Sequence, residues 1–242
     1  VAVCVYDLAE KLGLETQFVG GSSFGGMYSK TSETILVPAL RPPGRQAFTC
    51  AHEIGHWHFG HGDRVDELST FDSDDSSDDD ERLVNMFAGF LLAPPWAVRA
   101  AVEKRNWDLN SLSPNQMYVV ATQLGMGYQS LIHHLRYSLR LIQSAHAERL
   151  LLTSPKQIRQ NYLRHSDSVH LAIAGKNWDS VPIDLSSGDY AILPSEVNIE
   201  GSSVDKTDTT ESGTVVRATI PGIARAETHD GSWASFIRVS RA

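Results

Sequence analysis

The stretch Arg45-Gln46-Ala47-Phe48-Thr49-Cys50-Ala51-His52-Glu53-Ile54-Gly55-His56 contains two histidines four residues apart, with a glutamate directly after the first. On an α-helix, positions i and i+4 lie on one face, one turn apart, so the two imidazoles can bind one metal ion. Glu53 lies about 100° around the helix from His52, beside that ion. The pattern predicts a helix over residues 44–59 in which His52 and His56 are metal ligands and Glu53 is the catalytic general base.

A catalytic zinc usually has three protein ligands and an open position for water, so one more ligand is needed. Glu81, at the start of a helix predicted over residues 79–92, is the best candidate. Asn85 follows it on the same helical face and can hydrogen-bond a ligating imidazole. Ala88, one turn further on, leaves room for the two helices to approach closely. The predicted metal ligands are therefore His52, His56 and Glu81, supported by Asn85.

The remaining histidines are predicted to serve other purposes. If the first helix continued, His58 and His61 would lie about 240° and 180° around it from His52, pointing away from the metal. His133 and His134 lie on a later helix and are interpreted as structural. Thr49 shares the ligand face one turn before His52.

The composition indicates a folded chain of one large or two smaller domains. It has 242 residues, 41% of them hydrophobic, and no apolar run long enough to cross a membrane. Residues 1–5 are too short and lack the basic flank of a secretory signal. The two cysteines, Cys4 and Cys50, do not form a disulfide framework, so we expect a cytoplasmic protein with two buried thiols.

The net charge of −8 is concentrated in one segment. Residues 63–81 hold ten acids and one base, which leaves 20 bases and 19 acids elsewhere. The chain therefore has no basic surface typical of nucleic-acid binding. The acidic segment is interpreted as a solvated connection, with a loop that attracts a basic partner as the alternative.

Hydrophobic spacing and turn residues predict helices and strands in the order typical of an α+β protein. The first part has a helix at 6–13, a strand at 15–19, a hairpin formed by 27–28 and 34–37, and helices at 44–59, 79–92 and 97–104. Helices at 114–124 and 128–141 resemble a helix-turn-helix unit, and 154–164 is a further helix. Strand-like segments then occur at 169–174, 190–193, 214–220, 224–227 and 235–239, and the polar stretch 201–213 is expected to be mobile.

These elements divide the chain into four predicted parts. Residues 1–104 form the metal-binding domain, and residues 105–150 form a helix-turn-helix-like region. Residues 151–165 connect this region to residues 166–242, a β-rich C-terminal domain interpreted as regulatory.

Two segments together resemble the ImmA/IrrE metallopeptidase family. They are Arg45-x-x-Phe48-Thr49-x-Ala51-His52-Glu53-x-Gly55-His56 and Glu81-x-x-Val84-Asn85-x-Phe87-Ala88-x-x-Leu91-Leu92-x-Pro94. The resemblance covers residues 6–142. The spacing from Glu81 to Asn85 is also similar to the third-ligand helix of gluzincins, although an acid usually stands where this chain has Asn85. Val84 and Ala93 depart from the commoner alanine and methionine.

The resemblance implies a zincin-like fold, a bound zinc ion with manganese as the alternative, and a bacterial or phage intracellular setting. It further implies cleavage of a helix-turn-helix transcriptional repressor, which would switch on stress-response or mobile-element genes. No direct contact with nucleic acid or membrane is expected.

Two other interpretations remain open. In one, the metal is structural and the protein is a non-enzymatic regulator that binds DNA or a partner through the helix pair at 114–141. In the other, the protease belongs to a defence or toxin–antitoxin system, and residues 166–242 sense the signal.

Overall fold

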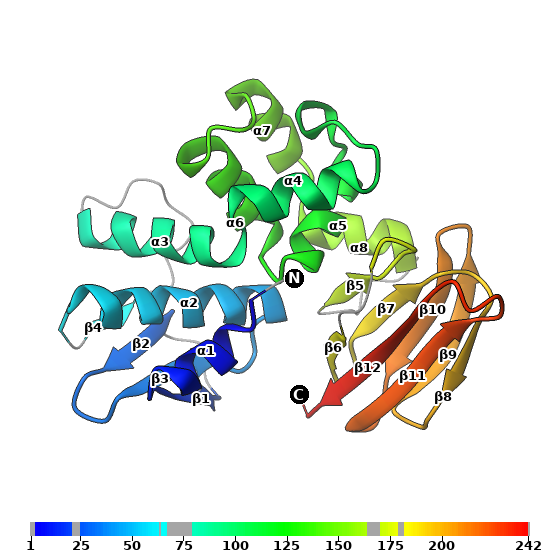
Figure 1. Ribbon diagram of the computed structural model, residues 1–242, viewed down its shortest axis with the longest axis horizontal. Helices are drawn as coiled ribbons and strands as arrows, with labels where there is room; N and C mark the ends of the chain where they lie inside the picture. Colours follow the sequence, from blue (N-terminus) through cyan, green and yellow to red (C-terminus); the bar gives the residue numbers. More distant parts are fainter. Residues whose placement is uncertain are drawn as a thin grey trace.

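The computed structural model describes residues 3–20, 25–62, 64–66, 79–163, 170–178 and 182–241. It has an α+β architecture in which a helical layer joins a small N-terminal sheet to a β-rich C-terminal part (Figure 1). Among the described residues, no single helix is long and apolar enough to span a bilayer. The bent pair α3 (Asp79–Leu92) and α4 (Pro95–Glu103) meets that criterion by length and composition alone.

The N-terminal part begins with α1 (Val5–Lys11) and a four-stranded sheet in the order β1-β3-β2-β4. The strands are β1 (Glu15–Val19), β2 (Gly26–Ser29), β3 (Thr34–Pro38) and β4 (Arg64–Asp66). β1 pairs with β3 in parallel, while β2 lies antiparallel to both β3 and β4. The predicted strand at 15–19 and the hairpin are confirmed.

Helix α2 (Pro43–Phe59) carries the motif and lies between this sheet and α3 (Asp79–Leu92) (Figure 1). Pro43 suits the first turn of α2, because a proline there sacrifices no intrahelical hydrogen bond. The helix is buried on nearly all sides from Phe48 to His56. Asp79, Asp80 and Glu81 form the first turn of α3, where acidic groups interact favourably with the helix dipole.

The helical layer continues with α4 (Pro95–Glu103), the short 3₁₀-helix η1 (Leu109–Ser111) and α5 (Pro114–Gln123). Ser113 and Gln116 form a reciprocal capping box that fixes the start of α5. After α6 (Tyr128–His133), the chain passes into a π-helical turn, η2 (His134–Ser138). The predicted helix at 128–141 is therefore shorter and interrupted. Helix α7 (Ser144–Leu151), which was not predicted, and α8 (Pro155–Leu163) complete the layer.

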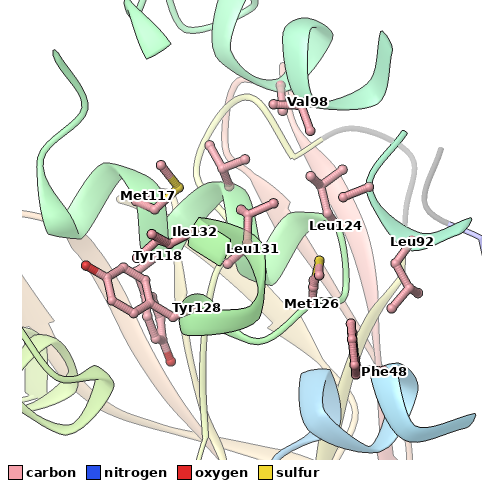
Figure 2. Close-up of a cluster of buried hydrophobic side chains, with 14 of the residues drawn as sticks. Phe48, Leu92, Val98, Met117, Tyr118, Leu124, Met126, Tyr128, Leu131 and Ile132 are labelled. Atoms are coloured by element: carbon pink, nitrogen blue, oxygen red, sulfur yellow. The ribbon is translucent and has the colours of Figure 1, made fainter. Parts of the chain in front are cut away.

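The apolar faces of α5 and α6 pack into a single core with α2, α3 and α4. Figure 2 shows ten labelled residues of this cluster: Phe48, Leu92, Val98, Met117, Tyr118, Leu124, Met126, Tyr128, Leu131 and Ile132. The core extends from Val5 in α1 to Val215 in the C-terminal part. The helix-turn-helix-like pair is thus packed as part of the N-terminal core.

The C-terminal part contains two four-stranded sheets, in the orders β5-β7-β10-β9 and β6-β12-β11-β8. Their buried faces share a second core, so the sheets form a sandwich (Figure 1). The strands are β5 (Leu171–Ile173), β6 (Ile183–Ser186), β7 (Tyr190–Leu193), β8 (Val197–Glu200), β9 (Val204–Thr210), β10 (Gly213–Ala218), β11 (Gly222–Thr228) and β12 (Ala234–Ser240).

The structure corrects the interpretation of residues 201–213 as a mobile stretch. Residues 204–210 form β9, which pairs antiparallel with β10 across a register shift at Val215 and Val216. Nearly every side chain of β9 is exposed, so its sequence lacks the apolar alternation of a half-buried strand. Backbone pairing and the buried neighbouring strand β10 hold this edge strand in place.

The two thiols also differ from each other, contrary to expectation. Cys50 in α2 is fully buried, whereas Cys4, at the N-cap of α1, is exposed. Burial raises the pKa of the Cys50 thiol to about 12. Cys50 therefore behaves as a small core residue, and no redox role is assigned to it.

Candidate metal and catalytic site

His52 and His56 lie one turn apart on the face of α2 that contacts α3, and both are almost completely buried. Their Nε2 atoms are 3.0 Å apart, and the two rings meet edge to face. Two imidazole nitrogens that converge in this way in a buried position are a typical arrangement for a shared metal ion.

Glu81 reaches the same point from the first turn of α3. Its Oε2 atom lies 3.4 Å from His52 Nε2, and its Oε1 atom lies 3.4 Å from His56 Nε2. The three side chains are all buried, and their ligand atoms lie within 4.8 Å of one another. Tetrahedral zinc with bonds of about 2.0–2.1 Å separates its ligand atoms by about 3.3 Å. The two nitrogens and the carboxylate therefore fit a zinc ion in both chemistry and spacing.

The close approach of α2 and α3 depends on small residues at their contact. A Cβ atom on Gly55 would lie 3.1 Å from Val84 Cβ and 3.2 Å from Phe87 Cδ1. Ala88, one turn beyond Val84, is completely buried. The predicted role of Ala88 in permitting this contact agrees with its burial.

Asn85 contacts the ring nitrogen of His52 that is not directed at Glu81. Its Oδ1 atom lies 3.0 Å from His52 Nδ1. An amide oxygen can only accept a hydrogen bond, so this contact places the proton of His52 on Nδ1. The Nε2 lone pair then faces Glu81 and the metal position. Asn85 thus occupies the place predicted for it.

His61 contacts His56, and the continuation of the helix on which its predicted direction depended does not occur. The helix does not continue: α2 ends at Phe59, and Gly60 adopts the left-handed conformation with φ 72°. The chain then turns back, and His61 Nδ1 comes within 3.0 Å of His56 Nδ1. The signal available in the sequence was Gly60, since glycine commonly ends a helix in this conformation.

Glu53 is buried on the side of α2 that faces β2. Gly26 in β2 lies against it: a Cβ atom built there would meet Glu53 Oε1 and would lie 2.6 Å from Thr49 Cγ2. The Thr49 hydroxyl donates a hydrogen bond to the Gly25 carbonyl at 3.4 Å. The Glu53 carboxylate is therefore confined between α2 and β2. In the sequence, Glu53 directly follows His52.

The other histidines do not join the site. His58 is exposed and stacks on Phe87, with ring centroids 5.7 Å apart. His134 is buried, and its Nε2 atom lies 3.1 Å from the Ala93 carbonyl. Burial lowers the pKa of His134 to about 4, so it is neutral near pH 7. Both agree with their structural interpretation.

The acidic segment lies mostly outside the described residues. Residues 63 and 67–78 lie outside the described residues, so neither interpretation of that segment is tested. Its last acids are placed, in the first turn of α3: Asp79 is exposed, Asp80 lies near His61, and Glu81 belongs to the metal group.

A helix bearing His-Glu-x-x-His, packed between a small mixed sheet and a helix that supplies a third carboxylate, defines the zincin-like class of metal-dependent hydrolases. The family model described as the IrrE N-terminal-like domain, a peptidase family, matches residues 9–136. This match covers more than half of the chain, and the chain belongs to that family. No curated protein matches the chain.

Proposed function

We propose that this protein is a zinc-dependent endopeptidase. The observation that carries the proposal is the buried group of His52, His56 and Glu81, with Glu53 following the first histidine on the same helix. Membership of a peptidase family supports hydrolysis of a peptide bond over a purely structural metal. Two imidazoles and one carboxylate, with the histidines in a His-Glu-x-x-His helix, are a ligand set that catalytic zinc uses, and manganese is the alternative.

In the proposed reaction, the chain provides binding, orientation and proton transfer. His52, His56 and Glu81 would hold the ion, which when bound supplies Lewis acidity toward a water and the substrate carbonyl. Glu53 accepts a proton from the attacking water and later donates it to the leaving amine. Asn85 keeps His52 in the tautomer whose Nε2 is available as a ligand.

We further propose that the substrate is a helix-turn-helix transcriptional repressor in a bacterial or phage stress or defence switch, and that cleavage takes place in the cytoplasm. The support is the resemblance of the two motif segments to the ImmA/IrrE metallopeptidases. The near-neutral charge outside residues 63–81 favours a protein substrate over nucleic acid.

The test of the catalytic assignment is Glu53→Gln. The variant keeps the size of the side chain and all three proposed ligands, so it should bind zinc like the parent. Its cleavage of a candidate repressor should fall by about 10²–10⁴-fold, since general-base catalysis typically contributes that much. Zinc content and the rate of repressor cleavage are the two measurements.

A matched control is Glu103→Gln, which changes an exposed glutamate at the end of α4. It should leave both zinc binding and cleavage unchanged. If Glu53→Gln cleaves as fast as the parent, Glu53 is not the general base. If the parent binds no divalent metal, the proposed function itself fails.

A further inference from the structure

His56 makes a second contact that parallels the one between His52 and Asn85. On the side of the ring away from the metal position, His56 Nδ1 lies 3.0 Å from His61 Nδ1. The His61 ring is largely buried, and its Nε2 atom lies 3.5 Å from Asp80 Oδ1. The three side chains therefore form a continuous series: Asp80, His61, His56.

The end of α2 places His61 in this position. Gly60 takes the left-handed conformation, and the His61 backbone N–H donates to the His56 carbonyl at 3.0 Å. This hydrogen bond spans the helix end in the manner of a Schellman motif and folds the chain back toward His56. The ring of Phe59 stacks on His61 with centroids 5.9 Å apart, which limits its rotation.

We propose that His61 and Asp80 position His56 as a metal ligand. This inference rests on the metal site of the proposed function. For Nε2 of His56 to bind an ion, its proton must lie on Nδ1, so that Nδ1–H donates to His61 Nδ1. His61 then carries its own proton on Nε2, directed toward the Asp80 carboxylate. The two adjacent acids of α3 thus have different roles: Glu81 binds the metal, and Asp80 orients His61.

Each of the two histidine ligands therefore has its own positioning partner. His52 is held by Asn85 from the second turn of α3, and His56 is held by His61 from the turn after α2. Such outer partners typically contribute about 10- to 100-fold to metal affinity or activity. His61 does not touch the metal position, so it is a positioning residue.

The experiment compares two substitutions of His61 in the full chain. His61→Phe keeps a ring for packing on Phe59 but removes the acceptor. His61→Asn loses the ring but keeps an acceptor oxygen close to the place of Nδ1. The dissociation constant for zinc is measured by competition with a chromophoric chelator. His61→Phe should weaken zinc binding by about 10-fold or more, and His61→Asn should restore most of that loss.

Matched controls separate this effect from general changes at the helix ends. His58→Phe alters an exposed ring two residues after His56 and should leave the zinc dissociation constant unchanged. Asp80→Asn is not a control but tests the outer member of the series: it should weaken zinc binding by about two- to fivefold, because its side chain is half exposed, and an unchanged affinity would remove Asp80 from the series. Asp79→Asn, in the same helical turn but almost fully exposed, should have no effect on zinc binding.

A second measurement does not depend on how the variants fold. In the zinc-loaded parent with ¹⁵N-labelled histidine, long-range ¹H–¹⁵N spectra should show His61 protonated on Nε2 and unprotonated on Nδ1. The proposal is overturned if His61 carries its proton on Nδ1, or if His61→Phe binds zinc as tightly as the parent. Equal losses in His61→Phe and His61→Asn would also overturn it, since packing would then explain both.

The proposed function and this inference fail in different ways. A parent that binds no zinc overturns both. A parent that binds zinc and loses cleavage in Glu53→Gln, but keeps its affinity in His61→Phe, upholds the protease and rejects the positioning role.

Discussion

Gly26 in β2 lies directly against the carboxylate of Glu53. A Cβ atom at this position would meet Glu53 Oε1 and would come within 2.6 Å of Thr49 Cγ2. Real Cβ atoms essentially never come this close to other heavy atoms, so both side chains, or the strand itself, would have to move. The glycine is therefore needed because strand and helix lie so close together, and not for backbone freedom.

We predict that Gly26→Ala reduces peptide cleavage by about 10-fold or more, because small displacements of a catalytic group are costly. Zinc affinity should stay near that of the parent, since the atoms nearest to the added Cβ belong to Glu53 and Thr49 and to none of the three ligands. Cleavage rate and zinc content are measured together. Gly20→Ala is the control, because a Cβ atom there meets nothing within 4 Å. An alanine variant at Gly26 that cleaves at the parental rate would show that Glu53 does not need its present position.

The sequence predicted the site where regular spacing determines the geometry. His52 and His56, and likewise Glu81 and Asn85, are four residues apart on helices, so each pair shares a face before any tertiary contact is known. His61 and Gly26 could not be found in this way. His61 reaches the site only because the chain reverses after Phe59, and Gly26 matters only because β2 packs against α2.

At the scale of the elements, the end of α2 depends on the conformation of Gly60. Its φ of 72° is unfavourable for residues with a side chain, while a Cβ atom there would meet no neighbour within 4 Å. A substitution at Gly60 is thus expected to destabilise the protein through the backbone conformation that the side chain must adopt, and not through a steric clash.

Gly60→Ala should lower the free energy of unfolding of the metal-free protein by about 1 kcal/mol. It should also weaken zinc binding, because the turn that presents His61 to His56 becomes strained. Denaturant titration gives the first quantity and chelator competition gives the second. Gly62→Ala, two residues later, has neither a positive φ nor a close neighbour, so it should change neither. Identical behaviour of the two variants would contradict the role given to the turn.

Helices were predicted better than strands in this chain, for a physical reason. The strand β12 alternates exposed and buried residues along its whole length, and the corresponding segment 235–239 was recognised. In contrast, β9 exposes almost all of its side chains, so no alternation marks it. The π-helical turn after α6 was also missed; its first residue, His134, packs tightly against Gly89 of α3, a contact between residues far apart in the chain.

At the scale of the whole molecule, the parts on either side of the predicted boundary between residues 165 and 166 share one hydrophobic core. Leu171, Ile173, Ile192 and Val215 of the β-rich part belong to the same hydrophobic cluster as the N-terminal helices. The buried hydroxyl of Tyr118 in α5 donates to the Leu171 carbonyl at 3.0 Å. The sequence predicted that the C-terminal part is β-rich, but it held no signal for this packing, which depends on side chains far apart in the chain.

We predict that a chain ending at residue 165 is less stable than the full protein by several kcal/mol. Fully burying a single aliphatic side chain contributes about 1.5–3 kcal/mol, and truncation removes four from this core. Thermal unfolding followed by circular dichroism measures the loss. Tyr118→Phe, which removes the hydroxyl that donates to the Leu171 carbonyl and also interacts with Arg159, should cost about 1 kcal/mol. A truncated chain that unfolds at the parental temperature would show that the β-rich part is energetically separate.

The ligand triad also joins two segments that are distant along the chain. His56 and Glu81 are 25 residues apart, and most of the chain between them lies outside the described residues. An ion held by both would stabilise the folded arrangement, because the ligands come together only in the folded chain and the free energy of binding then adds to that of folding. Chelation would then do more than stop catalysis: it would leave the contact between α2 and α3 dependent on packing alone.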